Sequence, residues 1–250
     1  MRLTQFKALS FDCYGTLIDW ETGLVRALEP IRAAAGVSPA ELLEAYGNAE
    51  HEAEEAHPGM RYCDLLQLVY RQLAERFDLP GDDDAARAFG QSVGDWPAFP
   101  DTRDALRYLK QHFRLIILSN VDRASFARSN ERLGVEFDQV LTAEEIGSYK
   151  PDPRNFDYLI HRLRSERIDK TELLHVAQSL FHDHVPANSM GIASAWIDRR
   201  HDKPGGGATK VPDPMPRFDF QFTSLGELAA AHHAELAQAL SQRLDFGRPS

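Results

Sequence analysis

Short apolar runs alternate with amphipathic segments over most of the chain. A strand is expected where an apolar run ends in polar or turn-forming residues, and a helix where apolar positions recur every three or four residues. On this basis the predicted strands are 7–12, 114–119, 139–141, 173–177 and 192–197. Helices are predicted between them over 102–112, 124–133, 153–163 and 184–190. Strands that alternate with helices favour an α/β fold with a parallel sheet.

A purely helical stretch interrupts this alternation directly after the first strand. Helices are predicted over 21–35, from Pro39 to a break at Pro58-Gly59, and over 62–77 and 83–94. The second of these is strongly acidic, and its glutamates are interpreted as a solvated face. We therefore divide the chain into a catalytic core, 1–19 and 97–250, and a helical cap, 20–96. Residues 202–216 are predicted as a loop, and a capping box at Ser224 is expected to begin a last helix.

Composition narrows the kinds of partner. The 250 residues carry 38 acidic against 28 basic side chains, a net charge of −10. This balance argues against nucleic acid or an anionic membrane as the main partner, although a local lysine can still hold a small anionic substrate. Two cysteines suggest no disulfide framework, and no apolar run is long enough to span a bilayer. We expect a cytoplasmic protein.

Polar residues stand where two of the predicted strands end. Asp12 follows the first apolar run and is followed by Cys13-Tyr14-Gly15-Thr16, while Ser119-Asn120 closes another. In open α/β sheets, ligands bind at the carboxyl ends of the strands. Asp12 is therefore a candidate nucleophile that would form an ester, or alternatively a capping residue of the next turn. Ser119 and Asn120 either bind a substrate or are ordinary turn residues.

Two further segments carry candidate chemistry. Lys150, held before Pro151-Asp152-Pro153, is either a cation beside the nucleophile or a surface lysine. Asp183 follows the strand 173–177, and it either activates water or complements a helix dipole. Gln178 is a polar group at the tip of that strand. His175 and His182 are interpreted as packing or solvent-facing residues.

In order and context, Asp12-x-Tyr14-Gly15-Thr16, Ser119-Asn120, Lys150-Pro151 and Asp183 resemble the four motifs of the haloacid dehalogenase superfamily. Tyr14, two residues after the nucleophile, is similar to the type II L-2-haloacid dehalogenase branch. The resemblance covers nearly the whole chain. It implies a Rossmann-like core with an inserted helical cap, an (S)-2-haloacid dehalogenase-like activity, and a homodimer as one oligomeric option.

The resemblance also implies how the reaction proceeds. Phosphatases of this superfamily carry an aspartate where Tyr14 stands and a Gly-Asp pair, which serves Mg²⁺, where Ala177-Gln178 stands. A halide leaves without a proton, so dehalogenation needs neither the acid nor a metal. We expect catalysis by Asp12, Lys150 and Asp183, substrate binding by Tyr14, Ser119, Asn120 and Gln178, and no cofactor. A small-molecule phosphatase and a catalytically degenerate binding protein are the alternatives.

The chain departs from the branch at two points. Its dehalogenases generally carry a cap arginine that holds the substrate and the halide, but residues 45–50 contain none. Arg26, Arg32 and Arg61 are the available substitutes. The fourth motif also has Gln178 and Leu180 where serine and asparagine are usual, and the amide of Gln178 could replace the serine.

Overall fold

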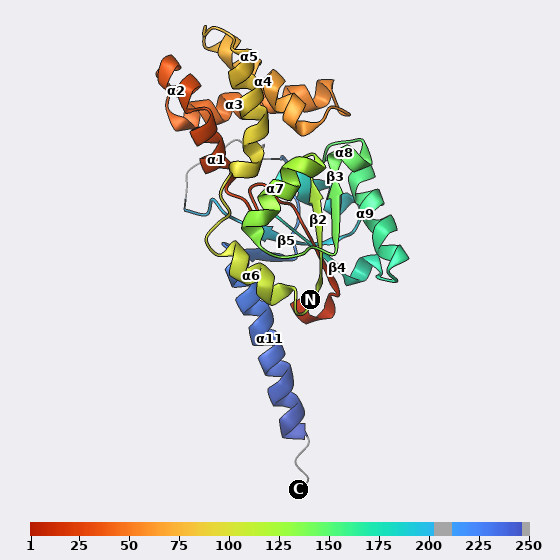
Figure 1. Cartoon of the computed structure of the whole chain (residues 1–250). Helices are drawn as coiled ribbons and strands as arrows, with labels where there is room; N and C mark the ends of the chain where they lie inside the picture. The colour runs from red at the N-terminus through yellow and green to blue at the C-terminus, as the bar shows by residue number, and fades with distance from the viewer. Residues whose placement is uncertain (203–211, 247–250) are drawn as a thin grey trace.

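A six-stranded parallel sheet forms the centre of the protein (Figure 1). The computed structural model describes residues 1–202 and 212–246, so most of the predicted loop 202–216 lies outside the described residues. The strand order is β3-β2-β1-β4-β5-β6. The strands are β1 (Ala8–Phe11), β2 (Arg114–Ser119), β3 (Gln139–Thr142), β4 (Leu173–Ala177), β5 (Ala193–Ile197) and β6 (Phe220–Phe222). The first five confirm the predicted strands. The sixth was missed, because its three residues are too short for a periodic signal.

The register of the sheet brings three polar strand ends together. β1 lies between β2 and β4, with Phe11 paired to Ile117 on one side and Val176 on the other. The side chains of β1 are buried throughout. Since all three strands run parallel, the residues that follow β1, β2 and β4 emerge at the same edge of the sheet.

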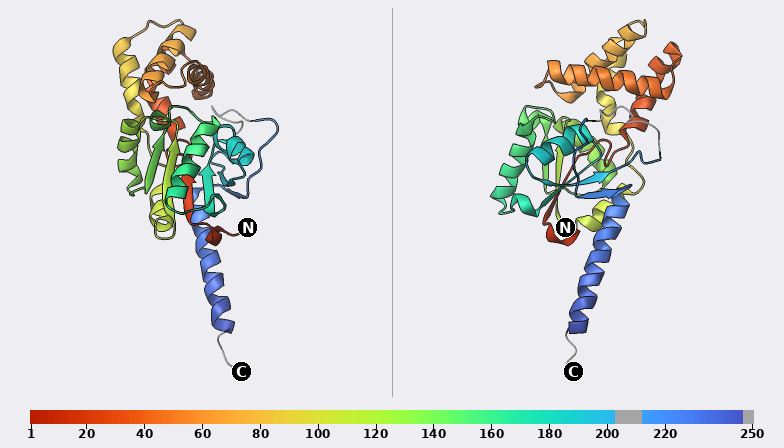
Figure 2. Two further views of the ribbon diagram at one scale, coloured as in Figure 1. Left: turned by 90° about the vertical axis from the view of Figure 1, so that its right-hand side faces the viewer. Right: turned by 180° about the vertical axis from the view of Figure 1, so that it is seen from behind.

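Helices cover both faces of the sheet. Alternate strand residues such as Leu9 and Phe11 pack into a core with α6 (Thr102–Leu109), α7 (Arg123–Leu133) and α11 (Leu225–Phe246). The intervening residues, such as Ala8 and Ile116, pack against α9 (Pro153–Ser165) and α10 (Val185–Ser189). α8 (Ala143–Ile146) follows β3. The end of α11 projects beyond the sheet in all three views (Figures 1 and 2).

Five helices gather above the carboxyl ends of the strands (Figures 1 and 2). They are α1 (Trp20–Ala27), α2 (Glu29–Ala35), α3 (Pro39–Ala56), α4 (Tyr62–Arg76) and α5 (Asp83–Gln91). The prediction of a single helix over 21–35 was wrong. The helix divides at Leu28, because Pro30 lacks the N–H that would continue the hydrogen-bond ladder. A capping box formed by Ser38 and Glu41 begins α3.

The remaining helical turns are short. Three are 3₁₀ turns: η1 (Leu3–Gln5), η2 (Ser92–Asp95) and η3 (Lys170–Glu172). The fourth, η4 (Leu180–His184), is a π-helical turn that leads into α10, so the predicted helix 184–190 begins with a wider turn than expected. π-helical turns are rare and occur often at functional sites. Among the described residues, no helix is long and apolar enough to cross a membrane.

Candidate active site

A tight turn places Asp12 at the end of β1. Gly15 has φ +97°, and a Cβ atom there would lie 3.0 Å from Trp20 Nε1 and 3.1 Å from Gln178 Oε1. Glycine is therefore required both by the backbone conformation and by the space. The turn brings the Thr16 hydroxyl back to donate to Asp12 Oδ2 at 2.8 Å. The Asp12 side chain is thus oriented by its own loop.

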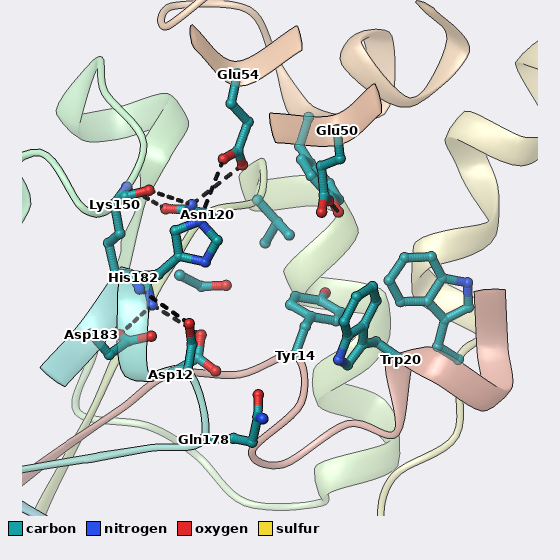
Figure 3. Close-up of a pocket in the computed structure, with 15 residues that line it drawn as sticks. Asp12, Tyr14, Trp20, Glu50, Glu54, Asn120, Lys150, Gln178, His182 and Asp183 are labelled. Carbon is teal, nitrogen blue, oxygen red and sulfur yellow. Dashed lines mark hydrogen bonds and ion pairs between the residues drawn. The ribbon is translucent and has the colours of Figure 1, made fainter. Parts of the chain in front are cut away.

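Lys150 joins Asp12 to Asp183. Its Nζ donates to Asp12 Oδ1 at 2.9 Å and to Asp183 Oδ1 at 2.7 Å, and all three side chains are buried (Figure 3). His175 Nε2 lies 2.9 Å from the same Asp183 oxygen, and its Nδ1 lies 2.8 Å from the Ser10 hydroxyl. The carboxylates of β1 and η4 are therefore bridged by one buried ammonium group.

Asn120 fixes the backbone of that lysine. Its Oδ1 accepts from the Lys150 backbone N–H at 2.6 Å, and its Nδ2 donates to the Lys150 carbonyl at 3.0 Å and to Glu54 Oε1 at 3.3 Å. The Asn120 amide is thus committed largely to Lys150. This pair of backbone contacts explains how the loop before α9 delivers Lys150 to a site formed by other strands.

The three charges differ in their affinity for protons. Burial and the Asp183 charge raise the pKa of Asp12, although Lys150 opposes them. Burial would also raise the pKa of Asp183, but Lys150 and His175 outweigh it and hold the pKa far below the usual range. Burial would lower the pKa of Lys150, but the two carboxylates raise it instead. Asp183 and Lys150 are therefore firmly ionised, whereas Asp12 holds a proton more readily than an ordinary aspartate does.

A small cavity opens beside Asp12. Its volume is about 80 Å³. Since one water molecule requires about 10–15 Å³ of such space, the cavity has room for several water-sized groups. All seven predicted site residues line it: Asp12, Tyr14, Ser119, Asn120, Lys150, Gln178 and Asp183. Other elements contribute the rest of the wall: Trp20, Glu50, Glu54, Tyr62, Trp96, Val121, Ser179 and His182. The site therefore accepts a small molecule and combines a polar floor with an aromatic side (Figure 3).

Tyr14 and Ser119 meet this cavity in different ways. The Tyr14 hydroxyl is 2.8 Å from the Ser129 hydroxyl, and its ring packs edge-on against Trp96 at 5.7 Å. Burial raises the pKa of Tyr14 well above its usual value, so the phenol stays neutral. The Ser119 hydroxyl is buried and has no hydrogen-bond partner among the described residues. Tyr14 therefore forms part of the cavity wall, while the Ser119 hydroxyl is available to hydrogen-bond a ligand.

Comparison with known proteins agrees with this geometry. Residues 6–177 match the haloacid dehalogenase-like hydrolase family. The chain belongs to the haloacid dehalogenase-like hydrolases. It is 31% identical over 202 residues to (S)-2-haloacid dehalogenase 1 of Pseudomonas sp. strain CBS-3, a match that covers 77% of this chain and 85% of that protein. It is 25% identical over 219 residues to (S)-2-haloacid dehalogenase of Pseudomonas putida, covering 80% and 87%.

Comparison with solved structures identifies the fold. The L-2-haloacid dehalogenase structure from Xanthobacter autotrophicus superposes with a TM-score of 0.72 at 23% identity, covering 90% of this chain and 97% of that one. The α/β fold expected for a haloacid dehalogenase-like hydrolase is thereby confirmed.

The α3 face of this hydrolase differs from the prediction of a solvated acidic helix. Glu50 and Glu54, four residues apart, both line the cavity. Glu50 accepts from the hydroxyls of Tyr46, at 2.7 Å, and Tyr62. The spacing of Tyr46, Glu50 and Glu54 at every fourth position was the signal that could have found this face. Burial raises the pKa of both glutamates, and the Glu50 charge raises that of Glu54 further.

None of the arginines considered as substitutes lines the cavity. Arg32 pairs with Glu29, and Arg61 pairs with Asp64, both near the surface. Arg26 is also absent from the cavity wall. In this chain, α3 therefore presents carboxyl groups where the branch generally presents an arginine.

His175 packs in the core, its ring 5.0 Å from that of Phe156, as interpreted from sequence, but both His175 and His182 also contact residues of the site. His175 is fully buried and contacts Asp183, and His182 lines the cavity with its Nε2 3.9 Å from Glu54 Oε2. For His182, sequence alone did not show this, because the π-helical turn η4 changes the direction of the side chains that follow β4.

Proposed function

We propose that this hydrolase converts short 2-haloacids to 2-hydroxyacids and halide through an ester on Asp12. The observation that carries the proposal is the Asp12–Lys150–Asp183 array beside Tyr14. The Asp12 carboxyl group, paired with Lys150, lines a small cavity, and the neighbouring position that would supply a proton to an alcohol leaving group holds a neutral phenol directed at Ser129. The similarity to (S)-2-haloacid dehalogenases over most of the chain supports the same reaction.

The first step is a displacement at carbon. An Asp12 carboxylate oxygen attacks C2 of the substrate, and the carbon–halogen bond breaks with its electron pair leaving on the halide. Lys150 and Thr16 favour the ionised form of Asp12 and so oppose the effect of its burial, because both donate to its oxygens. A halide is a stable anion, so this step needs no acid and no Lewis-acidic metal. Metal independence follows from the chemistry of the leaving group.

The charges around the cavity favour a singly charged substrate. Four carboxyl groups, those of Asp12, Asp183, Glu50 and Glu54, line the cavity together with Lys150. Repulsion grows with the charge on the ligand, so a phosphate dianion is disfavoured more strongly than a carboxylate monoanion. The carboxylate of a short haloacid can accept from the Ser119 hydroxyl, which is buried and otherwise unpartnered among the described residues. This supports a haloacid over the alternative of a phosphomonoester.

The proposal also gives the helices α1–α5 a role as a cap. We assign residues 20–96 as a cap over a core of 1–19 and 97–250, since α3 supplies Glu50 and Glu54 to the cavity roof (Figure 3). A cap of this kind excludes water while the carboxylate attacks, which strengthens the electrostatic interactions in the site. A cytoplasmic location and a homodimeric state both stay predictions.

Two sets of substrates test the proposal. The purified protein is incubated with chloroacetate and L-2-chloropropionate, and separately with p-nitrophenyl phosphate, each with Mg²⁺ or with EDTA. We expect halide release that EDTA does not reduce, and little phosphate release. Phosphate release that depends on Mg²⁺, with no halide release, would establish the phosphatase alternative. No turnover of any substrate would favour a degenerate binding site.

A further inference from the structure

The second half of the reaction needs a group that takes a proton from water. We infer that His182, held by Glu54 of α3, is the general base that activates water for hydrolysis of the Asp12 ester. This inference rests on the proposed function, because it requires that an ester forms on Asp12. It assigns His182 a catalytic role and makes Glu54 the residue that positions and polarises it.

Asp183 is poorly suited to take that proton. Its Oδ1 accepts from Lys150 Nζ at 2.7 Å and lies 2.9 Å from His175 Nε2. These contacts stabilise the carboxylate and thus lower its affinity for a proton. Its Oδ2 is buried and unpartnered among the described residues, so it is the competing candidate that an experiment must exclude.

His182 has the position that a base requires. The turn η4 presents it to the same cavity as Asp12, and Ser179 Oγ accepts from its backbone N–H at 3.1 Å. In Figure 3 the imidazole lies between Glu54, on the cap side, and Asp12, on the core side. Its Nε2 is 3.9 Å from Glu54 Oε2, within ion-pair distance. One side of the ring therefore faces a carboxylate while the cavity lies beside it.

Glu54 is itself fixed in place. It is 9% exposed, and Oε1 accepts from Asn120 Nδ2 at 3.3 Å. Because Asn120 also binds the Lys150 backbone, α3 and the catalytic loop share one hydrogen-bonded connection. A buried carboxylate has a raised affinity for protons and is a strong partner for an imidazolium. A carboxylate beside the ring stabilises the imidazolium that forms when His182 takes a proton from water.

The step balances with water as the only added reactant. The water oxygen bonds to the Asp12 carbonyl carbon while one water proton moves to His182. The carbonyl oxygen of Asp12 thereby becomes the oxyanion of a tetrahedral intermediate beside Lys150. Collapse breaks the bond between that carbon and the ester oxygen, which came from Asp12 and is now bonded to C2 of the substrate. The departing oxygen takes the proton from His182 and becomes the hydroxyl of the 2-hydroxyacid. Asp12, now bearing one oxygen from water, releases its proton to solvent.

The charged groups around His182 come from several elements. Glu54 faces it from α3, Asp183 precedes α10 within the same turn, and Asp12 and Lys150 lie across the cavity. His51 of α3 lies beyond Phe181, whose ring is 5.9 Å from His51 and 5.1 Å from His182. Among these, Glu54 is the group whose removal changes the charge beside the imidazole without removing a direct partner of Lys150 Nζ.

The test separates ester formation from ester hydrolysis. In His182→Gln, we expect one equivalent of halide to appear at close to the wild-type rate, followed by turnover slowed by about 10²–10⁴-fold. Intact-protein mass spectrometry should then show the Asp12 ester accumulating. His161→Gln, on the exposed surface of α9, is the matched control and should behave as wild type.

Glu54→Gln tests the positioning role by a different readout. Glu54→Gln removes the negative charge beside the imidazolium, so the acid limb of the pH–rate profile for ester hydrolysis should move to lower pH, and Glu54→Asp should restore it in part. His182→Gln with full turnover and no accumulated ester would overturn the inference and leave Asp183 as the base. Wild-type protein that releases no halide would instead refute the proposed function.

Discussion

Replacing Lys150 with methionine is the substitution that most directly probes the buried charge array. The methionine retains much of the volume of the side chain but removes a cation that lies 2.9 Å from Asp12 and 2.7 Å from Asp183. Both carboxylates are buried, at 7% and 0% exposure. Asp183 keeps its contact with His175, while Asp12 keeps only the hydroxyl of Thr16 among its described donors. The substitution therefore isolates an uncompensated charge in the core.

The expected loss is large at neutral pH. Removing one partner of a buried ion pair destabilises a protein by about 3–5 kcal/mol. In the variant the folded-state pKa of Asp12 rises further, so the penalty is full at neutral pH and disappears as pH falls below the unfolded value of about 4. In the wild type the depressed pKa of Asp183 contributes stability above that pH, which is lost as pH falls. The difference between the two proteins should therefore shrink in acid.

Urea unfolding followed by tryptophan fluorescence, at pH 7 and in steps toward pH 4, measures this difference. Lys110→Met is the matched control, since Lys110 pairs with Asp138 at 2.7 Å but is 34% exposed, and Asp138 also binds Arg114. Such a pair is worth about 0–1 kcal/mol. The reasoning fails if Lys150→Met is within about 1 kcal/mol of wild type at pH 7, or if its deficit does not change with pH.

Three further variants test other parts of the site. Asp12→Asn should abolish halide release yet stay within about 1 kcal/mol of wild-type stability in urea, because the amide oxygen can still accept from Lys150 and the amide nitrogen can donate to the Thr16 hydroxyl; retained activity would exclude the ester. Tyr14→Phe should leave halide release close to wild type and reduce the unfolding free energy by about 1 kcal/mol, since it removes only the contact with Ser129; a large loss of activity would give the phenol a chemical role. Burial lowers the pKa of His184 from 6.5 to about 4, so between these pH values the imidazole is protonated in the unfolded chain but not in the folded one. The unfolding free energy should therefore fall by up to about 3 kcal/mol from pH 6.5 to 4. In urea titrations His184→Gln should weaken this pH dependence, and an unchanged pH dependence would assign it to other groups.

Much of the core could be predicted from the chain because local pattern and long-range order agree there. The apolar runs of β1, β2 and β4 each end in polar residues, and parallel pairing brings those ends to one edge of the sheet. Asp12, Ser119 and Gln178 thus meet for reasons that sequence shows. Lys150 could be predicted as a site residue because a rigid Pro-Asp-Pro segment follows it. Its contact with Asn120, however, is seen only in the folded structure.

The cap side of the site could not be predicted in the same way. A charged residue on an amphipathic helix is ordinarily solvent-facing, and whether Glu50 and Glu54 meet solvent or a cavity depends on how α3 sits over the sheet. His182 escaped prediction because a π-helical turn shifts the side-chain spacing that an α-helix would give. In both cases tertiary placement, rather than local propensity, decides what the side chain contacts.

The origin of the product oxygen tests the central claim most directly. A single turnover of a 2-haloacid is carried out with excess enzyme in heavy-oxygen water containing EDTA, and both the product and the peptide that holds Asp12 are weighed by mass spectrometry. Because Asp12 supplies the oxygen that attacks carbon, the heavy oxygen should appear in the Asp12 carboxylate and not in the 2-hydroxyacid. Heavy oxygen in the hydroxyl of the first product molecule would show direct attack by water and contradict the covalent mechanism.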